Sequence, residues 1–128
     1  MDSVDEWLVR FENDVDMQVA EAQRKAEAAA NMADEMTRVV GRAQAERGEI
    51  AVTTDVAGRV TGLKLTAAAV RHHPDALAGK LLETINRARR DAGRQALDLA
   101  ADTFGEDSST YARIAEELGL ARQEGEVQ

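Results

Sequence analysis

The sequence predicts an α+β protein: a long N-terminal helix, an antiparallel β-hairpin or three-stranded sheet, a long second helix and a short C-terminal helix. Apolar residues recur at helical spacing over residues 4–36 and again over 74–103. Between these stretches, apolar and polar residues alternate over about 39–46, 49–55 and 59–66, as is typical of half-buried strands. A length of 128 residues suits one domain.

The first helical stretch is long for a chain of this size. Its apolar positions are three or four residues apart, and no Gly or Pro interrupts them. Residues 4–36 therefore predict a helix of about 50 Å, whereas a compact chain of this length has a diameter of roughly 36 Å. The helix must project as an arm or pair with another chain. We expect it to serve a dimer rather than to fold back on its own chain.

The segment TTDVAGRVTGLKL has the pattern of a β-hairpin. Alternate side chains of 49–55 and 59–66 fall on opposite faces, so each strand has one face suited to a core. Asp55 and Gly58 stand at the first and fourth positions of a type I turn, where Gly is free to take a positive φ. Residues 39–46 alternate weakly, and they predict either an extension of the first helix or a first strand.

The second long helix is predicted over 74–103. Pro74 suits the first helical position and Asp75 suits the first turn. A stripe of Leu, Ile and Ala continues through two glycines, which lower helix propensity without ending the pattern. Residues 106–128 are an acidic C-terminal extension, with a short helix in TYARIAEELGLA and a frayed tail after it.

The core predicted for one copy is thin. Aromatic residues make up 3% of the chain, so the interior must be built from Ala, Val, Leu and Ile. Each alanine buries little apolar surface, and an isolated two-stranded hairpin is marginal in water. We therefore expect a homodimer in which a second copy completes the core.

Charge is distributed unevenly. Residues 1–37 hold 3 basic and 10 acidic side chains (net −7), and 95–128 hold 2 basic and 8 acidic (net −6). Residues 38–94 hold 11 basic and 6 acidic side chains (net +5), although the whole chain is at −8. A local basic surface binds a polyanion even on an acidic protein.

The order of GEIAVTTDVAGRVTGLKL followed by HPDALAGKLLETINRARRDA, over about residues 4–100, resembles the YbaB/EbfC family. The resemblance implies a tweezers-like homodimer, cytoplasmic and at the nucleoid, that binds duplex DNA with little sequence preference and influences gene expression. It places a YbaB/EbfC-like domain at 1–105. Some family-like proteins serve type VII secretion, so the alternative is an accessory module that holds a partner protein's helix against the arm without binding DNA.

The candidate DNA-binding residues lie in the basic centre. Arg87, Arg90 and Arg94 fall within roughly 60° of one another on the second helix, opposite its apolar stripe, and guanidinium groups suit phosphate. The alternative is that they pair along the helix with acidic residues four positions away. Further candidates contribute to the same positive balance: Arg38, Arg42, Arg59 and Lys64.

Other chemistry is not indicated by the sequence. The chain has no Cys, and the adjacent His72 and His73 lack further ligands at metal-binding spacing. No nucleophile elbow, P-loop or dinucleotide motif occurs, so we expect no enzyme activity, cofactor or metal. No apolar run approaches the length of a membrane span. The strands lack aromatic residues for stacking on bases, which favours contact with the duplex backbone.

Overall fold

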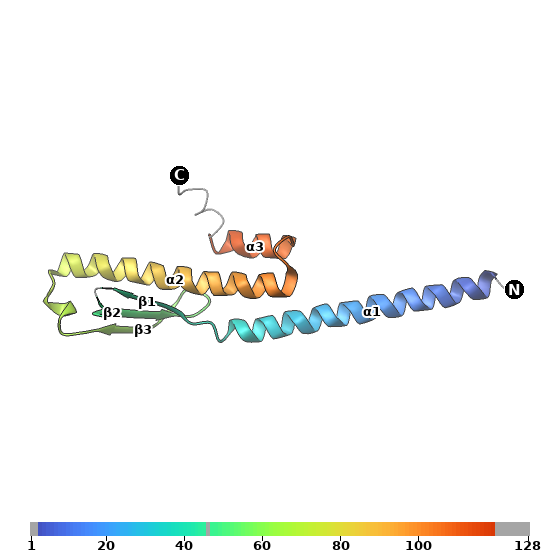
Figure 1. Cartoon of the computed structure of the whole chain (residues 1–128), viewed down its shortest axis with the longest axis horizontal. Helices are drawn as coiled ribbons and strands as arrows, with labels where there is room; N and C mark the ends of the chain where they lie inside the picture. Colours follow the sequence, from blue (N-terminus) through green and yellow to red (C-terminus); the bar gives the residue numbers. More distant parts are fainter. Residues whose placement is uncertain (1–2, 46, 120–128) are drawn as a thin grey trace.

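The computed structural model describes residues 3–45 and 47–119, and the tail predicted to fray lies outside them. The elements follow the predicted order (Figure 1): α1 (Ser3–Met36), β1 (Gly41–Ala45), β2 (Ile50–Thr54), β3 (Val60–Leu65), a short 3-10 turn η1 (Ala69–Arg71), α2 (Pro74–Phe104) and α3 (Ser109–Glu117). The predicted fold class is confirmed, and the weakly alternating stretch after α1 is a strand rather than a helix extension.

The three strands form one antiparallel sheet in the order β1-β2-β3. Ile50, Val52 and Thr54 point to the face that α2 covers and are fully buried there, as their alternation predicted. The turn also matches: the Gly58 N–H donates to the Asp55 carbonyl at 3.0 Å, Gly58 has a φ of 84°, and the β2-β3 register shifts at the end of the strands.

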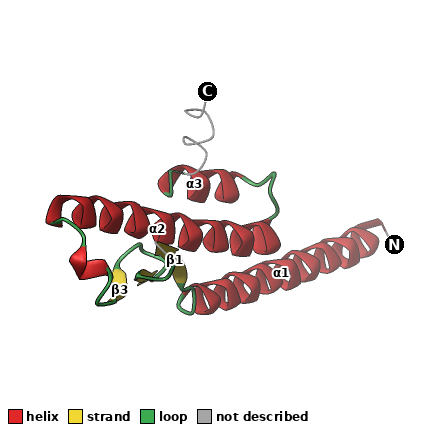
Figure 2. Ribbon diagram, turned by 60° about the vertical axis from the view of Figure 1, so that its left-hand side comes forward, coloured by secondary structure: helices red, strands yellow, loops and turns green. Residues whose placement is uncertain are grey.

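Helix α2 is the centre of the body. Pro74 is in its first turn, and the His73 side chain caps it by accepting a hydrogen bond from the Asp75 N–H at 3.2 Å. One face of α2 lies on the sheet, and α3 lies along the opposite side of α2 (Figures 1 and 2). Most of the buried apolar side chains are alanines, and α2 supplies four of them: Ala88, Ala92, Ala96 and Ala100. The interior is accordingly thin.

Helix α1 extends well beyond this body, with the N terminus at its far end (Figures 1 and 2). Only its second half approaches α2, where Ala28 and Phe104 line one hollow. None of its described residues is buried. Its first half leaves large apolar side chains exposed, among them Trp7 and Phe11. Among the described residues, no helix is apolar enough over a sufficient length to cross a membrane.

Strand β3 is less covered than its pattern suggested. In the antiparallel register, Leu63 lies opposite Val52 and Leu65 lies opposite Ile50, so both leucines are on the α2 side of the sheet. Leu63 is nevertheless 52% exposed and Leu65 36% exposed, because α2 lies over β1 and β2. The hairpin is half-buried at β2, while β3 is an open edge with apolar side chains beside it.

Candidate nucleic-acid interface

Two of the predicted arginines on α2 are exposed and have no partner among the described residues. Arg90 and Arg94 are exposed and four positions apart, so they share one side of the helix. Within residues 3–45 and 47–119, neither side chain takes part in a hydrogen bond or an ion pair. Their guanidinium donors are therefore available to an external acceptor.

The third predicted arginine, Arg87, has a structural contact. Its Nη2 donates to the Gln44 carbonyl of β1 at 2.8 Å. One turn along α2, the Asp91 carboxylate accepts from the Arg42 N–H at 2.9 Å, and Gln95 Nε2 donates to the Val40 carbonyl at 2.8 Å. Three side chains at i, i+4 and i+8 thus bond every second residue along the outer edge of β1. They close this edge to further strand pairing.

This arrangement bears on the alternative in which the arginines pair along the helix. The pairs expected at that spacing were Glu83–Arg87, Arg87–Asp91 and Arg94–Asp98, and none is among the ion pairs of the described residues. Asp91 is instead engaged by the backbone of β1 and by Gln95. The positive charge of Arg90 and Arg94 is therefore not neutralised along α2.

The remaining candidates lie elsewhere on the body. Arg42 and Lys64 alternate with buried or α2-facing positions of β1 and β3, so they stand on the open face of the sheet. Arg59, at the hairpin turn, donates to Asp55, and Arg38, just after α1, pairs with Asp34 at 2.8 Å. One chain thus presents two basic surfaces, one on α2 and one on the sheet, rather than a single patch.

The hairpin turn is tied by its own charges and by one arginine that the sequence did not single out. Arg59 donates to the Asp55 carboxylate from its backbone N–H and from Nε, each at 2.9 Å. The backbone hydrogen bond is the main reason that the pKa of Asp55 is lowered. Arg89 Nε donates to the Gly58 carbonyl at 2.8 Å and so joins α2 to the turn. Nothing in its local sequence distinguishes Arg89 from its neighbours.

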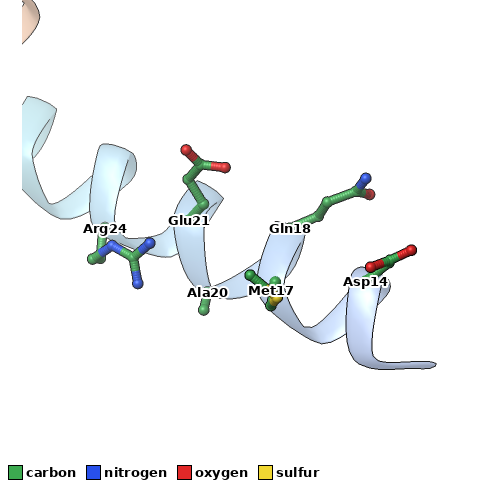
Figure 3. Close-up of a pocket in the computed structure, with 6 residues that line it drawn as sticks. All are labelled: Asp14, Met17, Gln18, Ala20, Glu21 and Arg24. Carbon is green, nitrogen blue, oxygen red and sulfur yellow. The ribbon is translucent and has the colours of Figure 1, made fainter. Parts of the chain in front are cut away.

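The described residues carry no cluster of side chains suited to metal binding. They contain no group of three or more His, Cys, Asp or Glu side chains that could hold a metal ion. His72 Nε2 lies 2.9 Å from Glu49 Oε2 and connects η1 to the start of β2. A hollow of about 460 Å³ lies along α1 (Figure 3), but all of its lining residues belong to this one helix, so it is a surface depression and not an enclosed pocket. The lining residues are Asp14, Met17, Gln18, Ala20, Glu21 and Arg24.

The structure thus combines an α+β body, exposed arginines on α2 that have no partner among the described residues, and an open sheet face that carries Arg42 and Lys64. Residues 12–106 match the YbaB/EbfC DNA-binding family, and the chain belongs to it. This is a family of DNA-binding, nucleoid-associated proteins and not a family of enzymes, so DNA is the expected partner and the nucleoid the implied location. No curated protein and no solved structure gives a significant match.

Proposed function

We propose that this chain binds duplex DNA as a homodimer, with little sequence preference, and influences gene expression through where it binds. The observation that carries the proposal is the pair Arg90 and Arg94, exposed on α2 and without partners among the described residues. Planar guanidinium groups donate in pairs to phosphate oxygens. Within the described part of the chain, no ion pair of Arg90 or Arg94 has to break before they do so.

Weak sequence preference is supported by what the basic surfaces lack. The open face of the sheet presents small side chains between Arg42 and Lys64: Ala51, Thr53, Thr61 and Gly62. No aromatic residue in the strands is available to stack on a base. Contacts to phosphate position a protein on DNA without reading its sequence.

Dimerisation is supported by the edges of the sheet. Side chains of α2 close the β1 edge, but β3 pairs only with β2 and leaves Val60, Leu63 and Leu65 exposed. Because the Thr66 N–H bonds to Glu49, the alternation of an antiparallel ladder turns the backbone groups of Leu63 and Leu65 away from β2. Two β3 strands related by a two-fold axis would pair there, bury these leucines and join the sheets. The two α1 helices would then project as the arms of the tweezers.

The test is a fluorescence-anisotropy titration with a labelled duplex of random sequence. Wild-type affinity is expected to fall at least tenfold between about 50 and about 200 mM salt, because phosphate contacts release counterions. The double variant Arg90→Glu/Arg94→Glu is expected to lose binding at the lower salt concentration. A matched control with the same change in net charge, Arg10→Glu/Arg113→Glu, alters exposed arginines on α1 and α3 and should retain most of the affinity.

Two results would count against the proposal. Equal losses in both variants would mean that net charge, rather than the α2 surface, governs binding. No binding by the wild-type protein even at low salt would favour the alternative of a secretion-system accessory that acts on a partner protein.

A further inference from the structure

The first half of α1 carries an exposed apolar stripe. Its members, with their exposed fractions, are Val4 (70%), Trp7 (56%), Leu8 (43%), Phe11 (52%), Val15 (39%) and Val19 (51%). The rings of Trp7 and Phe11 stack with centroids 5.4 Å apart. We call these six residues the arm face. It spans about four helical turns at positions three or four apart, which is the spacing of a helix-binding surface. Four of the six, Val4 to Phe11, precede the stretch that matches the family, which begins at residue 12.

The arm face is bordered by carboxylates. Asp5, Glu12 and Asp16 follow one edge of the stripe at helical spacing. Residues 3–19 together hold 5 acidic side chains and 1 basic side chain, a net charge of −4. Such a surface repels phosphate, so binding to DNA does not explain it. A strip of large apolar side chains that stays uncovered on a soluble helix is a typical protein-interaction site.

A second copy of α1 is a poor occupant. In an antiparallel helix pair, equivalent edges face each other, so the edge carrying Asp5, Glu12 and Asp16 would meet itself. In a parallel pair, the facing edge contains Asp14 and Glu21 beside one base, Arg10, so acidic residues still prevail on both edges. The large apolar side chains of α2 and α3 are half-buried within the chain, apart from Leu82, which is exposed. Among the described residues, a second copy therefore offers no helix with an uncovered apolar stripe and a basic edge.

We propose that the arm face docks an amphipathic helix of a different protein, with an apolar stripe and Lys or Arg along one edge. The apolar side chains of the partner helix pack around Trp7 and Phe11, and its basic edge lies against Asp5, Glu12 and Asp16. This inference goes beyond DNA binding and does not depend on it. The first half of α1, which carries the arm face, extends beyond α2 (Figure 1), and α2 is the helix that holds Arg90 and Arg94, so one molecule can hold the helix and DNA together.

A synthetic helical peptide tests this directly. The probe is a three-heptad peptide with leucines at the a and d positions and lysines along the flanking edges. Trp7 is the single tryptophan of the chain, so selectively excited tryptophan emission reports on the arm face alone. Saturable binding with a shift of Trp7 emission to shorter wavelength is expected. The same peptide with glutamate in place of lysine should bind at least about tenfold more weakly.

Variants of the full chain locate the site. The variant Phe11→Ala/Val15→Ala keeps Trp7 as the fluorophore. Its affinity for the lysine peptide should be at least about tenfold lower, because a few aromatic and aliphatic side chains dominate the energy of such interfaces. Met17→Ala, which removes a side chain that is 69% exposed on the other side of α1, is the matched control. The variant Asp5→Lys/Glu12→Lys/Asp16→Lys should reverse the peptide preference and bind the glutamate peptide more tightly than the lysine peptide. Circular dichroism should be unchanged in all three variants, and DNA affinity should be unchanged in the two variants that keep the net charge, Phe11→Ala/Val15→Ala and Met17→Ala.

Three outcomes would overturn the proposal. One is the absence of peptide binding, and another is equal binding of the two peptides. The third is a shift of Trp7 emission on raising the concentration of protein alone, because a second copy would then cover the arm face. Since DNA affinity is measured separately, failure here leaves the proposed function standing, and failure of DNA binding leaves this site testable.

Discussion

At the scale of single residues, Asp55 shows how one carboxylate sets a turn. It accepts hydrogen bonds from the backbone N–H and the Nε of Arg59, and its own carbonyl accepts from Gly58. The first of these contacts is the main cause of its lowered pKa. A carboxyl group whose pKa is lower in the folded state stabilises the fold above its unfolded pKa, and this contribution disappears as the pH falls through the folded value.

The variant Asp55→Asn measures that contribution. Asparagine cannot ionise but still accepts a hydrogen bond in the turn. The wild-type protein should melt at a higher temperature than the variant near neutral pH, and the difference should shrink as the pH falls below about 4. Thermal unfolding followed by circular dichroism at several pH values gives the comparison. A difference that stays constant down to pH 3 would show that ionisation of Asp55 contributes nothing to the turn.

Arg87 marks the limit of prediction at this scale. A helical wheel groups it correctly with Arg90 and Arg94, since that grouping depends only on a rotation of 100° per residue. The wheel says nothing about distance from a strand more than forty positions earlier, so the contact with Gln44 was not predictable. Arg90 and Arg94 remain predictions as DNA contacts, and Arg87 is first of all a side chain that holds β1.

At the scale of elements, the packing of β1 on α2 depends on Gly41. A Cβ at this position would meet the Ala88 carbonyl oxygen, and it would lie 2.6 Å from Thr54 Oγ1 and 2.8 Å from the Ala92 Cβ. These obstacles include the backbone of a helix, which cannot rotate aside. Strand and helix are therefore in contact at a distance that only glycine permits.

The substitution Gly41→Ala should destabilise the protein by about 3 kcal/mol, at the upper end of the cost of overpacking a core. Gly79→Ala is the matched control: nothing lies within 4 Å of a Cβ there, and alanine in a helix interior should stabilise by about 0.5–1 kcal/mol. Urea unfolding at one fixed protein concentration measures both. Similar midpoints for the two variants would rule out the close packing of β1 against α2.

The elements themselves were largely predictable. Long apolar periodicities gave α1 and α2 almost to the residue, and the Asp55–Gly58 turn gave the hairpin. Strand β1 was ambiguous because its inward-facing side chains are Gly41, Ala43 and Ala45, which carry little hydrophobic signal. The exposure of β3 could not be foreseen either. Strand alternation identifies which face of a sheet is apolar, but it does not show how many of the strands a helix covers on that face.

At the scale of the whole molecule, the described residues leave apolar side chains exposed on two elements in particular, at the arm face of α1 and along the β3 edge. The uncovered edge and the alanine-rich interior both support a dimer joined through β3. In such a dimer, each basic surface occurs twice, so a duplex meets four arginines from the two copies of Arg90 and Arg94. Their removal should lower the salt dependence of DNA affinity by at most about 3.6 in the log–log slope.

Sedimentation velocity of the protein, alone and with a labelled duplex, tests whether two copies act together. At micromolar concentration the wild-type protein is expected to sediment as an elongated dimer and to bind the duplex as two chains per DNA. Leu63→Arg/Leu65→Glu should shift it to single chains with weaker DNA binding, whereas Val9→Glu on α1 should not. A wild-type protein that sediments as a stable single chain, and binds DNA in that state, would contradict a shared β3 edge and the paired arginine surfaces built on it.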